Sequence, residues 1–327
     1  MTATNPEFGA HPADGIAAAA ARSAGEGGWF WRHEGPTLVV AATIYGAWGL
    51  LLWFHAALPW WVLAPAGGYV VQWHFSLQHE AIHSWRTLPH WLRTAIVWPP
   101  IGLWFPFELY RKSHSIHHRN TYLTYPGEDT ETLYHKEAAW RRYPAAWRRV
   151  LLVNQTFLGR LVLGPLIRPP RLWLIELRRL WRGDTPHVWI WARHFAGLAA
   201  LVALLETLGV PLWRYLLEFA YPGIMYGMMR SFIEHRWDER PSRRIAIVES
   251  NPVFGLLFLW NNLHAVHHSF PTLSWYRLPR IWREHRSRII EHNGGYLFAG
   301  YGEIARRWLL RPVFVPIHPP SRERGAA

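Results

Sequence analysis

Long uncharged stretches alternate with basic ones along the chain, and this alternation predicts its elements. A membrane helix needs about 20 apolar residues. The stretches that approach this length are 37–57, 60–77, 188–208 and, last, 212–232. The first two are joined by a few uncharged residues around Pro59, which indicates a helical hairpin. Glu218 lies inside the last stretch and is expected to face protein or a cavity, because a carboxylate is costly in lipid.

Shorter apolar stretches predict segments that do not span. Residues 94–107 carry three prolines and residues 252–263 cover only 12 positions, so both are expected at the interface or folded back. Residues 150–167 are interrupted by an arginine and a proline, which favours interfacial amphipathic helices, with an ordinary solvated face as the alternative. Residues 1–36 are rich in alanine and glycine and lack the pattern of a signal peptide, so we expect a mobile tail.

Charge changes this picture by locating the chain at a membrane surface. Of its 35 lysines and arginines, 14 lie in residues 108–187 and 14 in residues 235–327, and the net charge is +13. These blocks adjoin apolar stretches and are studded with tryptophan, which favours contact with anionic lipid over nucleic acid. The chain has no cysteine, which excludes disulfides, thiolate zinc sites and cysteine-held iron–sulfur clusters.

Four spans would place both ends of the chain and the basic blocks on one side, which the positive-inside rule makes cytoplasmic. The predicted fold is therefore an all-α, polytopic membrane protein of about four transmembrane helices with a cytoplasmic helical cap. The expected division is a tail over residues 1–36, a membrane domain over residues 37–280 and a basic cytoplasmic tail over residues 281–327.

Histidine is the residue with the most informative spacing. Eight of the 20 histidines stand in three clusters with the sequences HEAIH, HSIHH and HAVHH. They are His79, His83, His114, His117, His118, His264, His267 and His268. On a helix, positions i, i+3 and i+4 share a face, so each cluster is expected to aim its imidazoles in one direction. Imidazole binds iron, zinc, copper and nickel. Eight imidazoles exceed one tetrahedral zinc and predict two metal ions.

These three boxes resemble those of the integral-membrane fatty acid desaturase and hydroxylase superfamily, which includes acyl desaturases, carotenoid hydroxylases and ketolases, and alkane hydroxylases. The resemblance covers residues 37–280 through box order, spacing, the paired spans between the second and third boxes, and the proline–aromatic stretch 270–279. It implies that the eight box histidines ligate two irons and that dioxygen is the co-substrate for oxidising an unactivated C–H bond. His235, at the end of the last span, is then a further candidate ligand, with a supporting or interfacial role as the alternative. Some acyl-CoA desaturases have asparagine one turn earlier, where this chain has Ser231.

Acidic residues near the boxes are candidates for orienting imidazoles through their second ring nitrogen. They are Glu80, Asp129, Glu131 and Glu234. A solvated loop is the alternative for Asp129 and Glu131, and Ser231 is a candidate for holding a water molecule.

The resemblance implies a lipid-like substrate, an acyl chain to be desaturated or hydroxylated, with a carotenoid or another amphipathic small molecule as the alternative. Electrons are expected from outside the chain, because it has no cysteine, no His-Pro-Gly-Gly haem motif and no glycine-rich dinucleotide motif. The basic cytoplasmic surface suits an acidic ferredoxin-type carrier, which would act with its reductase.

Two other classes of function compete with this interpretation. The first cluster also fits HExxH, the helix motif of zinc metalloproteases, with Glu80 as general base, but that function leaves the other clusters idle. A metal carrier is expected to line a path through the bilayer with polar groups. Here the histidines are expected to gather at one membrane face instead.

Overall fold

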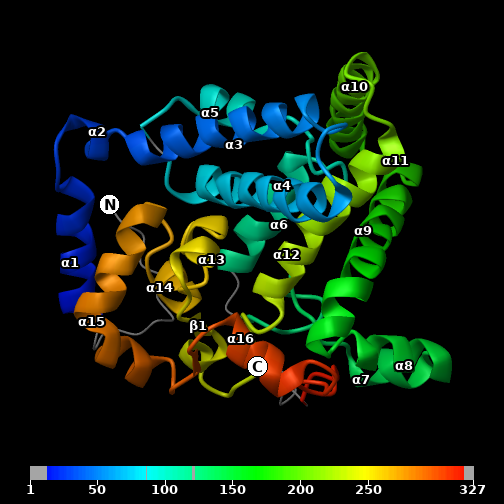
Figure 1. Ribbon diagram of the computed structural model, residues 1–327. Coiled ribbons are helices and arrows are strands. Elements are labelled where there is room, and N and C mark those ends of the chain that lie inside the picture. Colours follow the sequence, from blue (N-terminus) through cyan, green and yellow to red (C-terminus); the bar gives the residue numbers. More distant parts are fainter. Residues whose placement is uncertain (1–12, 86, 120–121, 320–327) are drawn as a thin grey trace.

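The computed structural model describes residues 13–85, 87–119 and 122–319, and most of them are helical, as the sequence predicted (Figure 1). Up to residue 207 the elements are α1 (Ala13–Gly25), α2 (Trp29–Arg32), α3 (Gly35–Trp53), α4 (Trp60–His83), α5 (His90–Val97), α6 (Phe107–Arg119), α7 (Glu137–Arg142), α8 (Ala145–Val153), α9 (Phe157–Trp181) and α10 (Thr185–Thr207). The later elements are α11 (Leu212–Tyr215), η1 (Leu216–Ala220), α12 (Tyr221–Ser231), η2 (Pro241–Arg244), β1 (Ile247–Val248), α13 (Pro252–Leu257), α14 (His264–Ser269), η3 (Trp275–Arg277), α15 (Leu278–His292), β2 (Leu297–Phe298) and α16 (Tyr301–Trp308). The strands β1 and β2 pair in parallel.

Among the described residues, two helices are long and apolar enough to cross a membrane, α3 and α10. They match the predicted stretches 37–57 and 188–208. The pair α8 and α9 meets the same criterion when taken together, but it is bent by 119°, so the candidates number two or three. The predicted count of four is not confirmed, because the second half of α4 is rich in polar residues and the stretch 212–232 is divided.

The division of residues 212–232 has a local cause. Pro222 has no N–H and cannot donate to the carbonyl of Glu218 one turn earlier. The chain forms a π turn, η1, and the N–H of Tyr221 bonds to the carbonyl of Leu216 instead. Glu218 is buried in this turn and pairs with Arg214 at 3.0 Å. It therefore faces protein, as expected for a carboxylate within an apolar stretch.

Helices α4 and α12 pack at very short range, and this contact sets the position of the site (Figure 1). A Cβ atom on Gly68 would lie 2.4 Å from Cβ of Pro222, and one on Gly223 would lie 2.4 Å from Cγ1 of Val71. Only glycine permits backbones to approach so closely. Because α4 ends in the first histidine cluster and α12 leads into His235, the contact brings these histidines to one place.

The residues expected to form an N-terminal tail are folded where the structure describes them. Residues 13–36 form α1, α2 and the start of α3, while residues 1–12 lie outside the described residues. Ile16, Ala19 and Ala20 are buried in a core shared with α14 and α15. Their i, i+3, i+4 spacing makes an apolar stripe of small side chains. The high alanine content concealed this stripe when the segment was considered as sequence alone.

The basic segment that starts at residue 281 is also part of the fold and not a separate tail. Its helix α16 buries Tyr301 and Ile304. Near its end, the N–H of His135 donates to the carbonyl of Pro316 at 2.8 Å, and the N–H of His318 donates to the carbonyl of His135 at 2.9 Å. The segment thereby fastens the loop after α6, and residues 320–327 lie outside the described residues.

Candidate metal centre

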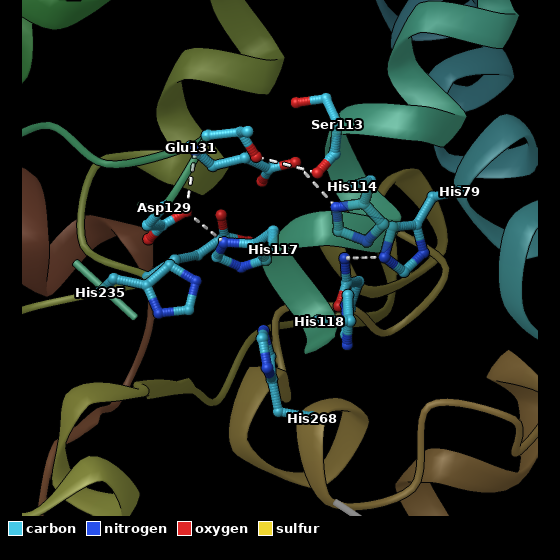
Figure 2. Close-up of polar contacts among 12 residues, drawn as sticks. His79, Ser113, His114, His117, His118, Asp129, Glu131, His235 and His268 are labelled. Atoms are coloured by element: carbon cyan, nitrogen blue, oxygen red, sulfur yellow. Dashed lines mark hydrogen bonds and ion pairs between the residues drawn. The ribbon is translucent and has the colours of Figure 1, made fainter. Parts of the chain in front are cut away.

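The nine histidines suggested by the sequence meet where α4, α6, α14 and the segment after α12 come together (Figure 2). They form two groups, and within each group the candidate ligand atoms lie within 4.8 Å of one another. The five-histidine group consists of His79, His83, His114, His118 and His267. The four-histidine group consists of His117, His235, His264 and His268. The groups are adjacent, since the rings of His118 and His268 stack with centroids 4.3 Å apart.

Each HxxHH cluster is divided between the two groups. On α6, His114 and His118 join the five-histidine group, whereas His117 joins the other. On α14, the i, i+4 pair His264 and His268 joins the four-histidine group, and the third histidine joins the five-histidine group. The expectation that a cluster aims all its imidazoles in one direction was therefore wrong for the two HxxHH clusters, whereas it holds for His79 and His83 of the first cluster, which join the same group. A turn of 100° per residue separates the i+3 and i+4 positions enough for one short helix to supply two sites.

Carboxylates accept hydrogen bonds from two histidines of α6, His114 and His117. Nδ1 of His114 donates to Glu131 at 2.8 Å, and Nδ1 of His117 donates to Asp129 at 2.8 Å (Figure 2). The Nε2 atoms of His114 and His117 are buried and have no hydrogen-bond partner among the described residues. A buried imidazole oriented through Nδ1 with an unpartnered Nε2 is the arrangement of a metal ligand.

The charges at the site favour a cation. Burial alone lowers the pKa of His117, but Glu131 and Asp129 outweigh burial and raise it to about 9. Burial tends to raise the pKa of Glu131, yet His114 and His117 hold it well below its usual range. The two carboxylates therefore stay ionised and stabilise positive charge beside the histidines. A bound metal ion would supply that charge.

Several histidines have no hydrogen bond to Asp129 or Glu131, and in these the neutral form dominates. Burial holds the pKa values of His118, His267 and His268 well below the usual range. Burial also lowers the pKa of His235, to about 3. Neutral imidazole is the form that ligates metals, so these side chains are ready to bind without releasing a proton.

The other acidic candidates differ in their contacts. Glu80 accepts the N–H of Trp275 at 3.0 Å and the hydroxyl of Ser84, so it joins the end of α4 to η3 and does not contact an imidazole. Glu234 pairs with Arg230 at 3.1 Å and lies 3.7 Å from Nδ1 of His264. The predicted orienting role therefore fits Asp129 and Glu131 by geometry, whereas the contacts of Glu80 are structural.

Asn261 contacts two of the histidines and was not among the sequence-based candidates, whereas the role of Ser231 in holding a water molecule stays a prediction. The hydroxyl of Ser231 is buried without a partner among the described residues and contacts no histidine nitrogen. Asn261 instead accepts from Nδ1 of His264 at 3.0 Å, and its amide nitrogen donates to Nε2 of His79 at 3.3 Å. It therefore connects the two groups. Its position three residues before His264 was the signal available in the sequence.

A cavity of about 570 Å³ lies against both histidine groups, since His79 and His235 line it. Its walls come from α4, α6, α9, α12 and the loop that follows α6, with Phe258 and Asn261 from the segment between α13 and α14. The apolar lining residues include Phe75, Phe105, Leu109, Ile224, Met228 and Phe258. A cavity of this size and lining is typical of a binding site for a lipid-sized molecule.

A model of the fatty acid desaturase family matches residues 57–300, about three quarters of the chain. The matched region contains every histidine of both groups. No curated protein matches the chain significantly.

Proposed function

The chain belongs to the fatty acid desaturase family, and we propose that it is a membrane oxidoreductase that uses dioxygen to desaturate or hydroxylate the acyl chain of a lipid or lipid-like substrate. The observation that carries the proposal is the convergence of nine histidines in two groups beside an apolar cavity. A carotenoid or another amphipathic small molecule is the alternative substrate, because apolar walls accept either.

We propose two iron ions, one held by each histidine group. A set of imidazoles with no thiolate suits iron, and five histidines in one group exceed the ligand number of tetrahedral zinc. The unpartnered Nε2 atoms of His114 and His117 fit metal ligation. When bound, the irons would supply the activation of dioxygen that removal of hydrogen from an unactivated C–H bond requires.

The protein's own contribution is position and exclusion of water. Phe75, Met228 and Phe258 line the cavity that His79 and His235 also line, so a chain lying against them has its carbons beside the histidines. Holding a reacting carbon in place and keeping it dry lowers the barrier for the intended reaction and limits side reactions. Asp129 and Glu131 fix the orientation of two ligands, which the same geometry requires.

The membrane arrangement we propose has four crossings: α3, α4, α10 and the stretch from α11 through α12. It places the histidine groups and both chain ends on the cytoplasmic side, where the basic segments concentrate. Electrons would come from an acidic ferredoxin-type carrier with its reductase. Exposed arginines of α7 and α8, Arg141, Arg142 and Arg149, offer charge for docking such a carrier.

Metal analysis and lipid profiling test the proposed function together. We expect two irons per purified chain. We also expect a lipid that loses two hydrogen atoms or gains one oxygen atom in aerobic cells carrying the gene, and not in cells without it. One zinc with no iron would favour a protease, and iron without any oxygen-dependent lipid change would favour a carrier.

The variant Glu80→Gln separates this function from an HExxH protease. We expect iron content and lipid oxidation to stay within about threefold of the wild type. The cost in unfolding free energy should be about 1 kcal/mol or less, because Ser84 and the N–H of Trp275 both donate to Oε1 of Glu80 and the side-chain oxygen of glutamine can accept both hydrogen bonds. Iron content, lipid oxidation and thermal unfolding are measured on one preparation. Loss of all activity with full metal content would support Glu80 as a general base.

A further inference from the structure

A stripe of cations on one helix face enters the cavity. Arg160, Arg168 and Arg171 of α9 are spaced i, i+8, i+11 and line it, together with Lys112 of α6. Arg160 is buried, with 1% of its surface exposed. Arg168 is half-buried, and Arg171 and Lys112 are exposed. The positive charges therefore extend from the protein interior to the solvent side of the cavity.

The two inner cations donate hydrogen bonds only to neutral acceptors among the described residues. Arg160 donates to the main-chain carbonyl of Asn154 at 2.9 Å and to the side-chain amide of Gln155 at 3.0 Å. Arg168 donates to the main-chain carbonyl of Glu131 at 3.1 Å. Burying a guanidinium is costly unless a negative group compensates it. Neutral oxygens compensate it only in part.

The outer cation Lys112 contacts an imidazole and not a carboxylate. Nζ of Lys112 lies 3.0 Å from Nε2 of His187. Within residues 13–85, 87–119 and 122–319, none of the four cations forms an ion pair with a carboxylate.

The carboxylates that line the same cavity already have partners of their own. The pairs are Asp129 with His117, Glu131 with His114, Glu176 with His187 and Glu234 with Arg230. These contacts direct the negative charges to the histidine groups and to the contact between α9 and α10. Arg168 lies within electrostatic range of Glu131, Glu234 and Asp129, but among the described residues none of the four cations pairs directly with a carboxylate, a contact that an anionic ligand would provide.

We propose that Lys112, Arg160, Arg168 and Arg171 bind the anionic head group of the amphiphile whose chain lies against Phe75 and the other apolar walls. The head group is a carboxylate or a phosphate, because the planar arginine fork donates two parallel hydrogen bonds to either group. This inference rests on the proposed function and narrows it. The substrate class becomes an acyl chain with an anionic head, and neutral carotenoids are disfavoured.

Equilibrium binding of three probes with the same chain, palmitate, hexadecyl phosphate and hexadecanol, tests the proposal. The full chain is measured in nanodiscs of neutral phosphatidylcholine. We expect one anionic probe or both to bind about tenfold tighter than hexadecanol. Tighter binding of palmitate identifies a carboxylate head, and tighter binding of hexadecyl phosphate identifies a phosphate head.

Variants locate the binding groups. Lys112→Gln with Arg171→Gln changes only exposed side chains, so folding should be unaffected, and we expect most of the anion preference to be lost with hexadecanol affinity unchanged. The matched control is Arg141→Gln with Arg142→Gln on α7, which is exposed and outside the cavity lining. It should keep the preference. A separate Arg168→Gln variant probes the half-buried position and should also reduce it.

Three results would overturn the inference. They are equal affinity for all three probes, an equal loss in the α7 control, and an unchanged preference in both cavity variants. Iron content and lipid oxidation of the same preparations separate this inference from the proposed function. Full iron and turnover without anion preference refute the head-group site alone. Anion preference in a chain that binds no iron refutes the proposed function and leaves the anion site in place.

Discussion

Replacing His267 with alanine is expected to abolish lipid oxidation and to empty the five-histidine group, while the protein still inserts into the membrane. Nε2 of His267 lies 3.1 Å from Nε2 of His118, and its ring centroid lies 4.9 Å from that of His83. Removing the imidazole of His267 takes one candidate metal ligand from the five-histidine group and leaves a cavity where its ring lay. Because metal centres act as units, we expect activity to fall about a thousandfold or more.

The companion variant is His268→Ala, which removes a ligand of the four-histidine group. Each single variant should retain at most one iron per chain, and the double variant should be no less active than either single one, because neither half works alone. His83→Ala should match His267→Ala, since both belong to the same group. Iron per folded chain and oxygen-dependent lipid oxidation are the measurements.

A matched control for these variants is His90→Ala, an exposed histidine outside both groups. It should keep full iron and full activity. A zinc protease would lose activity with His83→Ala and tolerate His267→Ala. Full iron and activity in both His267→Ala and His268→Ala would refute the two-iron site.

The histidines were predictable because their chemistry is encoded locally. A helix of known pitch converts HxxHH into imidazoles on neighbouring faces, whatever the rest of the chain does. Asp129 and Glu131 were found as candidates for a similar reason, since they lie in the first loop after α6. Which carboxylate contacts which imidazole depends on the path of that loop, and the spacing of residues does not specify it.

The features that sequence reasoning missed depend on contacts between distant segments. Asn261 was overlooked because an amide has no titration, and its link to His79 joins residues 182 positions apart. The α1 helix is stable because α15 covers its apolar stripe, and neither segment reveals the other. The π turn before Pro222 shortens a stretch whose composition alone looked sufficient for a span. Local patterns thus specify ligands more reliably than they specify packing.

Asp129→Asn is expected to lower iron affinity about 10- to 100-fold, with the loss confined to the four-histidine group. All three groups bonded to the Asp129 carboxylate are donors: Nδ1 of His117 at 2.8 Å, the N–H of Thr124 at 2.8 Å and the N–H of Glu131 at 2.9 Å. Asparagine offers one acceptor and one donor, so its NH₂ group must face an N–H. His117 and the N–H of Glu131 share Oδ1 and the N–H of Thr124 reaches Oδ2, so the NH₂ group faces either Thr124 or both other donors. Each orientation displaces the loop that positions His117.

Glu131→Gln is the matched comparison, because the same change of charge meets a different environment. Glu131 is bonded to His114 through one oxygen, and 26% of its side chain is exposed. Glutamine can present its carbonyl to Nδ1 of His114 and turn the amide nitrogen to solvent, so His114 keeps its tautomer. We therefore expect a loss of less than about tenfold in iron affinity, because an outer partner is weakened but not removed.

Titration with a competing chelator measures both affinities, and thermal unfolding checks that each variant is folded. Excess iron should restore most of the activity of Asp129→Asn, since the defect lies in binding. Equal losses in the two variants would show that carboxylate charge alone governs the site. Iron affinity of Asp129→Asn equal to the wild type would show that His117 is not a ligand, because a change in the group that orients it would then have no effect on binding.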